Sequence, residues 1–440
     1  MIATAGSLVS LFLGMVVGGA VLYGAGVGVS AASLLVRALL GLTLLAELVI
    51  HPALGIALAL VLVAATWRSH ASSSPVPDRI PFITSSGAAA LLVAIIAAVL
   101  RPPVPIFWDE SVWLGKARVA CEGGAVLMER VLDPQSVLVP RGYPIVAAVL
   151  EACFALRDDS LASLVAGGTA LVLVSLALYV LLLGRAAESS FEERATLVVL
   201  ALTPLAWVHL RSVQLDLPEG LLVAALVLAV ERAERGDRLG LPAAVTAALL
   251  LGIKDEGLAG ALAVAIALGT RGATPLARRA AWTAFGSLAI SMLVFRVRLH
   301  VAGSANDDHT LGALSPRFVL DLLRDGARDA SDMQTWGLVP AVSLAACIAT
   351  LSRDAPSRAR RVALVIVLHA LGLALALVLG PQQVRDFALE GTLLDRLGLE
   401  LLPSAALLIP RLLPAPVLEE PRTPSTADSP DRLPDTGTTT

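Results

Sequence analysis

Apolar stretches long enough to cross a membrane as helices recur along the whole chain, separated by short polar segments. A helix needs about 20 mainly apolar residues to span the hydrocarbon core. Two or three such helices are predicted between Ile2 and Trp67, with breaks near Gly26–Ser30 and at His51-Pro52. The later predicted spans are Phe82–Leu100, Leu161–Leu183, Ala195–Leu210, Leu217–Val230, Leu241–Ile253, Gly257–Leu268, Ala281–Phe295, Trp336–Leu351, Val362–Leu379 and Leu401–Leu413. This pattern predicts an all-α polytopic membrane protein of about 11–13 transmembrane helices.

The composition narrows the class of protein further. Of the 440 residues, 56% are hydrophobic and 16% are charged, whereas a soluble domain has about a quarter charged residues. No basic, aromatic-rich face indicates nucleic acid as a partner. The three cysteines are too scattered for a disulfide framework or a zinc site.

Arginine-rich segments predict the orientation of the helices, because short cytoplasmic loops are enriched in basic residues. If successive spans cross the membrane in alternating directions, five such segments lie on one side. This requires that Tyr143–Leu156 forms an interfacial or re-entrant helix that does not cross the membrane. These segments are Arg68–Arg79, Arg185–Arg194, Arg232–Arg238, Arg271–Arg279 and Arg353–Arg361. The sequence thus predicts N-terminal transmembrane helices over 1–80, a catalytic membrane domain over 81–413 with its first outer loop at 101–160, and a disordered cytoplasmic tail over 414–440.

The first outer loop carries an acidic pair, Asp109-Glu110, between Trp108 and Trp113. One carboxylate at the membrane face could deprotonate an acceptor hydroxyl. Either could ligate a divalent cation, Mg²⁺ or Mn²⁺, that offsets a phosphate. An ordinary interfacial loop with an aromatic belt explains the same residues.

Two further polar sites lie on the same predicted side. Asp216 precedes Pro218 at a helix start, where it suits either an N-cap or a functional carboxylate. Lys254-Asp255-Glu256 interrupts two apolar stretches. It is either a solvated hairpin tip or a site whose lysine contacts a phosphate. Arg396, in the last outer loop, is either a phosphate contact or a lipid-headgroup anchor.

The order of these pieces resembles the GT-C superfamily of membrane glycosyltransferases, particularly the protein O-mannosyltransferases and lipid A aminoarabinose transferases. Members carry an acidic pair in a large first extracytoplasmic loop, a basic-Ala segment and a Gly-containing turn. A Pro-containing helix, an Asp-x-Pro, a Lys-x-x-Gly and an Arg ahead of a Leu-Pro span follow. The matching pieces are Asp109-Glu110, Lys116-Ala117-Arg118, Glu122-Gly123-Gly124, Gly142-Tyr143-Pro144, Asp216-Leu217-Pro218, Lys254-Asp255-Glu256-Gly257, Asp395-Arg396 and Leu402-Pro403. Arg141-Gly142-Tyr143-Pro144 stands where many members have an HPP-like element.

The resemblance implies inverting transfer of a sugar from a polyprenyl-phosphate donor to a glycan, lipid or protein acceptor. The reaction would occur at the outer face of a bacterial plasma membrane, within the cell envelope, without a nucleotide cofactor. Asp109 would be the general base, with Glu110 beside it. The expected donor-phosphate contacts are Lys116, Lys254 and Arg396, and the expected substrate-orienting residues are Tyr143, Asp216 and Glu256. Asp109 and Asp216 are the expected ligands of a divalent cation, if one is used.

Other classes of membrane protein remain open. A secondary transporter would place charged residues within its spans and show two matching halves. A polysaccharide polymerase or ligase, or a non-catalytic membrane scaffold, shares the helix count and the outer loops.

Cysteine labelling tests the predicted orientation. In a cysteine-free background, a membrane-impermeant thiol reagent added from outside should modify a cysteine at Gly123 or Ser304 and leave one at Ser357 unmodified. External labelling at Ser357 would reverse the orientation.

Overall fold

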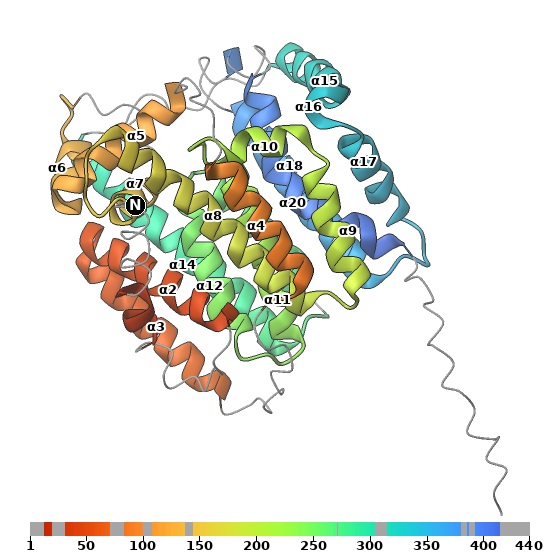
Figure 1. Ribbon diagram of the computed structural model, residues 1–440, viewed down its shortest axis with the longest axis horizontal. Helices are drawn as coiled ribbons and strands as arrows, with labels where there is room; N and C mark the ends of the chain where they lie inside the picture. The colour runs from red at the N-terminus through yellow and green to blue at the C-terminus, as the bar shows by residue number, and fades with distance from the viewer. Residues whose placement is uncertain are drawn as a thin grey trace, which may run out of the picture.

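A computed structural model describes residues 13–19, 31–70, 83–99, 108–136, 144–270, 272–303, 315–379, 385–386 and 392–413. These residues form helices and no strand (Figure 1), which confirms the all-helical prediction. The helices are α2 (Ala31–Ile50), α3 (Pro52–His70), α4 (Ser85–Val99), α5 (Trp108–Glu122), α6 (Gly124–Leu132), α7 (Val146–Phe154), α8 (Leu161–Ala186), α9 (Ser190–Ala201), α10 (Pro204–Leu210), α11 (Asp216–Glu234), α12 (Gly240–Leu251), α13 (Gly257–Gly269), α14 (Pro275–Val301), α15 (Pro316–Ala330), α16 (Met333–Trp336), α17 (Val339–Ala349), α18 (Ser357–Leu379) and α20 (Thr392–Leu412). The predicted tail over 414–440 lies outside the described residues.

Several of these helices suit a membrane. Four are long and apolar enough to cross one, namely most of α2 together with α8, α14 and α18, and a fifth results if α9 and α10 form one broken span. The multi-pass prediction is thereby supported, while the larger count of 11–13 helices stays a prediction. Between α9 and α10 the axis bends by 80°, so a continuous span over Ala195–Leu210 is wrong. Pro204 lacks an N–H and disfavours helical backbone at Thr203, which explains the break.

Helix α11 lies at the centre of the bundle. Its residues from Asp216 to Ala233 are all buried, and α8, α12, α14, α13 and α20 pack around it. A helix buried on every side is stable only when its neighbours cover its apolar side chains and pair its charged ones. The close approach of α20 depends on Gly220, where an added Cβ would lie 2.6 Å from the Leu399 carbonyl oxygen.

The N-terminal region contains three helical segments among the described residues: 13–19, α2 and α3. The predicted break at His51-Pro52 is confirmed, since only His51 separates α2 from α3. The segment 13–19 packs on α2 through small residues, because a Cβ at Gly18 would collide with the Arg37 carbonyl. Such small-residue contacts are typical of helices packed in a membrane.

The two ends of the bundle differ in chemistry. At one end, Arg235 and Arg358 both donate to the Ala186 carbonyl, so the arginine-rich segments after α8, after α11 and before α18 lie together. At the other end lie α5, α6 and α7, in the upper left of Figure 1. The interfacial segment predicted at Tyr143–Leu156 becomes the nine-residue α7, which packs against α5 and α8.

A pair of glycine substitutions tests the packing around α11. Gly220→Ala should lower the free energy of unfolding by about 1–3 kcal/mol, because the new methyl group meets the α20 backbone. Gly286→Ala in α14 is the control, since a Cβ there has nothing within 4 Å. It should be neutral or stabilising by up to about 1 kcal/mol. Thermal unfolding in detergent measures both variants, and equal midpoints would contradict this packing.

Candidate functional site

Lys254 lies buried where α12 ends and α13 begins, surrounded by carboxylates. Its Nζ donates to Asp216 Oδ1 at 2.9 Å and to Glu400 Oε1 at 2.7 Å. Glu219 Oε2 lies 3.4 Å away and Glu256 Oε2 3.9 Å away. These contacts join α11, α20 and the α12–α13 connection. The solvated hairpin tip is therefore the wrong interpretation of Lys254, although Asp255 and Glu256 are only half-buried.

The backbone around Lys254 explains how the chain reaches this position. The connection between α12 and α13 is tight, and a Cβ at Gly257 would lie 2.2 Å from the Leu251 carbonyl oxygen. A larger residue at 257 is thus excluded without a backbone shift. The glycine of the Lys-x-x-Gly sequence keeps the lysine facing α11 and α20.

Asp216 is the second centre of the cluster. The N-cap of α11 is Leu215, without a side-chain cap, so the N-cap interpretation of Asp216 is wrong. Its two oxygens serve other groups: Arg396 Nε donates to Oδ2 at 3.1 Å, and Lys254 donates to Oδ1. His209 Nδ1 lies 3.8 Å from Oδ2. Asp216 thereby links α10, α11 and α20 to Lys254.

The charges of this cluster do not balance. Lys254 and Arg396 face four carboxylates, those of Asp216, Glu219, Glu256 and Glu400. With every group ionised, two negative charges are in excess. An excess of buried charge is costly unless protons or a cation neutralise it. The cluster is therefore built to hold positive charge beyond its own two cations.

Helix α5 connects the first outer loop to this end of the bundle. Glu110 is fully buried, and its Oε1 accepts a 2.8 Å hydrogen bond from the Val213 amide just before α11. Lys116 is also buried, and its Nζ lies 5.5 Å from the centre of the Trp113 ring. Glu110 therefore has a structural role, because it binds the backbone just before α11. The catalytic role expected for it stays a prediction.

Two groups of this region have displaced pKa values. Burial lowers the pKa of the Lys116 ammonium to about 7, opposed by the charge of Asp255. Burial raises the pKa of Asp255 to about 6, although Arg296, with which it forms an ion pair, lowers it. Burial thus favours the uncharged form of Lys116, and an added negative charge nearby would favour its protonated form.

The predicted site residues are only partly brought together. Asp216, Lys254, Glu256 and Arg396 converge, whereas the Asp109 side chain and Tyr143 lie outside the described residues. A metal ion between Asp109 and Asp216 stays a prediction, and there Asp216 would share its oxygens with other partners. Both of its oxygens are already held by Lys254 and Arg396.

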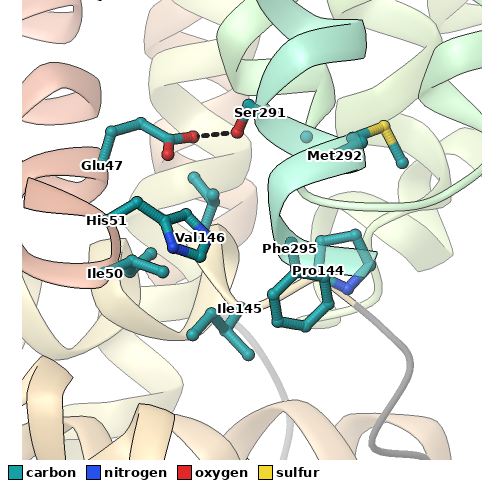
Figure 2. Close-up of a pocket in the computed structure, with 10 residues that line it drawn as sticks. Glu47, Ile50, His51, Pro144, Ile145, Val146, Ser291, Met292 and Phe295 are labelled. Atoms are coloured by element: carbon teal, nitrogen blue, oxygen red, sulfur yellow. Dashed lines mark hydrogen bonds between the residues drawn. The ribbon is translucent and has the colours of Figure 1, made fainter. Parts of the chain in front are cut away.

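A small pocket opens beside the cluster, between α2, α7 and α14 (Figure 2). Apolar side chains from Ile50, Ile145 and Phe295 form much of its wall, with Gly252 at the end of α12. Its polar residues are Glu47, whose Oε1 accepts a hydrogen bond from the Ser291 hydroxyl, and His51. The cavity, of about 20 Å³, has room for about one water molecule.

Sequence reasoning missed three ionisable residues that the fold brings together: Glu219, His369 and Glu400. All three are fully buried. Glu219 follows Asp216 by one helical turn, and Glu400 follows Arg396 by one turn, which places each on the same helix face as its partner. His369 stands near the middle of the predicted span Val362–Leu379. An ionisable residue within a span was the available signal.

A second ionic network closes the opposite end of the bundle. Arg411 binds both oxygens of Glu231, at 2.8 and 2.9 Å, and its Nε donates to Glu192 at 2.8 Å. Arg358 adds a 2.9 Å bond to Glu231. Both oxygens of the Glu231 carboxylate accept hydrogen bonds from arginines. This network is therefore a structural contact that joins α9, α11, α18 and α20.

No known family model matches the chain, and no characterised protein or solved structure is significantly similar to it.

Replacement of the central lysine tests the electrostatic role of the cluster. Lys254→Met should lower the free energy of unfolding by about 3–5 kcal/mol, because Asp216 and Glu400 lose their shared cation in a buried place. The matched control is Arg317→Met in α15, whose exposed side chain lies 3.9 Å from Asp321. That change should stay within about 0.5 kcal/mol. Similar thermal midpoints for the two variants would show that the cluster is dispensable.

Proposed function

We propose that this chain is a membrane glycosyltransferase of the GT-C type, which transfers a sugar from a polyprenyl-phosphate donor to an acceptor at the membrane face. One observation carries the proposal: α5, which begins at the acidic pair Asp109-Glu110, packs at the end of the bundle where Asp216, Lys254 and Arg396 meet. Four of the pieces that resemble the family, those around Glu110, Asp216, Lys254 and Arg396, are far apart in sequence and lie at one end of the bundle.

A donor phosphate would be repelled by the excess carboxylates around Lys254, so its candidate contact is Lys116, which neighbours Arg296 and Asp255. Lys116 and Arg296 lie close enough to Asp255 for their charges to act on it. The negative charge of an incoming phosphate would favour the protonated form of Lys116. The resulting ammonium would then be a cation for the phosphate to contact. Lys254 and Arg396 are already bound by carboxylates, so their contribution is to position Asp216 and Glu400. Lys116 is the better candidate for the phosphate.

The pocket supports the same proposal. It lies between α2, α7 and α14 and includes Gly252, two residues before Lys254. A lipid-linked donor needs an apolar surface next to cations at the membrane face. The apolar wall of the pocket is a candidate for a small part of that surface. Asp109, at the start of α5, would act as the general base toward the acceptor hydroxyl.

A second candidate function is an ion-coupled transporter. It is favoured by buried carboxylates that have no hydrogen-bond partner among the described residues, namely both oxygens of Glu219 and of Glu151. Unpaired ionisable groups within a membrane bundle commonly mark proton or ion pathways. Under this alternative the cluster would bind and release a cation during transport.

Transfer assays on purified protein in lipid nanodiscs test the proposed function. Release of polyprenyl phosphate from polyprenyl-phosphate sugars, followed by mass spectrometry, should require the wild-type chain and an acceptor. Asp109→Asn should reduce transfer by about 10²–10⁴-fold, as expected when a general base is lost, and should retain donor binding.

The matched control is Asp159→Asn, because Asp159 is an exposed carboxylate near α5 that pairs only loosely with Arg118, at 3.5 Å. It should leave the transfer rate unchanged. Full activity of Asp109→Asn would refute the assignment of the base. If the wild type consumed no sugar donor and instead showed gradient-driven uptake into proteoliposomes, the transferase proposal would be wrong and the transporter would be favoured.

A further inference from the structure

Glu219 of α11, His369 of α18 and Glu400 of α20 converge inside the bundle next to Lys254. Each offers one ligand atom, and these atoms lie within 4.8 Å of one another. The side chains of all three are completely enclosed by protein. Gly260 of α13 makes room for the imidazole, because a Cβ there would lie 3.3 Å from His369 Nε2.

The polar atoms that face this space lack hydrogen-bond partners among the described residues. They are both oxygens of Glu219, both ring nitrogens of His369 and Oε2 of Glu400. Buried polar atoms are nearly always paired, and each unpaired one costs roughly 1–3 kcal/mol. Lys254 fixes the orientation of Glu400 by binding Oε1, which directs Oε2 toward His369 Nε2 at 3.8 Å. Lys254 thus orients Glu400 and lies 3.4 Å from Glu219 Oε2, while the ring nitrogens of His369 have no hydrogen-bond partner among the described residues.

The charge of the cluster and the type of its ligand atoms indicate which ligand these three side chains would bind. The carboxylates around Lys254 and Arg396 carry two negative charges in excess, which one divalent cation would neutralise. One imidazole with two carboxylates is a mixed nitrogen and oxygen set, which favours transition metals, whereas Mg²⁺ and Ca²⁺ prefer oxygen ligands alone. Metal–ligand bonds of about 2.0–2.1 Å in a tetrahedral site place neighbouring ligand atoms roughly 3.3–3.5 Å apart. The pair His369 Nε2 and Glu400 Oε2, at 3.8 Å, is within a few tenths of an ångström of that spacing. The widest pair, within 4.8 Å, would have to close by at most about 1.5 Å.

We propose that Glu219, His369 and Glu400 bind one divalent transition-metal ion of the Zn²⁺ or Mn²⁺ class within the helix bundle. The ion cross-links α11, α18 and α20 and compensates the charge of the Lys254 cluster. This site is distinct from a cation between Asp109 and Asp216, and it holds whether the chain is a transferase or a transporter. Two carboxyl protons are the competing way to remove the charge excess, and they would need no metal.

Metal content of the full-length protein tests the proposal. The protein is purified in detergent through an affinity tag without histidines, stripped with a chelator, and dialysed against Zn²⁺ or Mn²⁺. Elemental mass spectrometry should find about one ion per wild-type chain. His369→Ala should reduce this to less than about a tenth, while His300→Ala, which removes an exposed histidine from the end of α14, should retain it. Metal addition should raise the thermal midpoint of the stripped wild type by several degrees, as binding to the folded state alone requires.

A spectroscopic measurement on the wild type decides the matter if His369→Ala fails to fold. Mn²⁺ bound at this site should show nitrogen coupling from one imidazole in pulsed electron paramagnetic resonance. His300→Ala should give the same signal. A wild type that binds less than a tenth of an ion per chain, or Mn²⁺ without nitrogen coupling, would overturn the site and leave protonation of the carboxylates as its explanation. Neither result depends on transferase activity, so this proposal and the proposed function fail separately.

Discussion

The buried ammonium of Lys254 is the interaction on which this end of the protein depends. Its hydrogen bonds to Asp216 and Glu400 join α11 and α20 to the connection between α12 and α13. Ionic groups are costly inside a membrane bundle unless they neutralise one another. The lysine therefore restricts how these helices can be arranged, because any shift that separates it from either carboxylate leaves a buried charge without a partner.

Small residues let the ionic groups meet. Gly220 lets the α20 backbone come against α11 one residue after Glu219, and Gly260 leaves space for the His369 ring. At the opposite end, Arg411 and Glu231 tie the same two helices together. Helices in lipid gain little from burying apolar surface, so close packing and polar contacts hold them together. The bundle is accordingly fixed by glycine contacts along its length and by ionic networks at its two ends.

The two ionic networks differ in a way that bears on function. The carboxylate of Glu231 is fully used by Arg411 and Arg358, as expected of a structural contact. The cluster around Lys254 instead has more carboxylates than cations, and among the described residues the oxygens of Glu219 and the ring nitrogens of His369 have no hydrogen-bond partner. Of these two networks, only the one around Lys254 has polar atoms that could still bind a ligand. It is therefore the network on which the proposed function and the proposed metal site both rest.

The sequence by itself determined the class of fold and the identity of much of the cluster. Long apolar runs specify helices through the cost of leaving backbone groups unpaired in lipid, and the interruption at Lys254 stood out because charged residues there need partners. The partners themselves were decided by tertiary structure. Glu400 lies 146 residues from Lys254, and which face of α20 meets α11 depends on packing at Gly220, which no local pattern encodes. The same holds for Asp216, whose position at a helix start suggested an N-cap until the fold brought Arg396 and Lys254 to its oxygens. Sequence periodicity identifies which residues are buried, but only the arrangement of helices decides which buried charges meet.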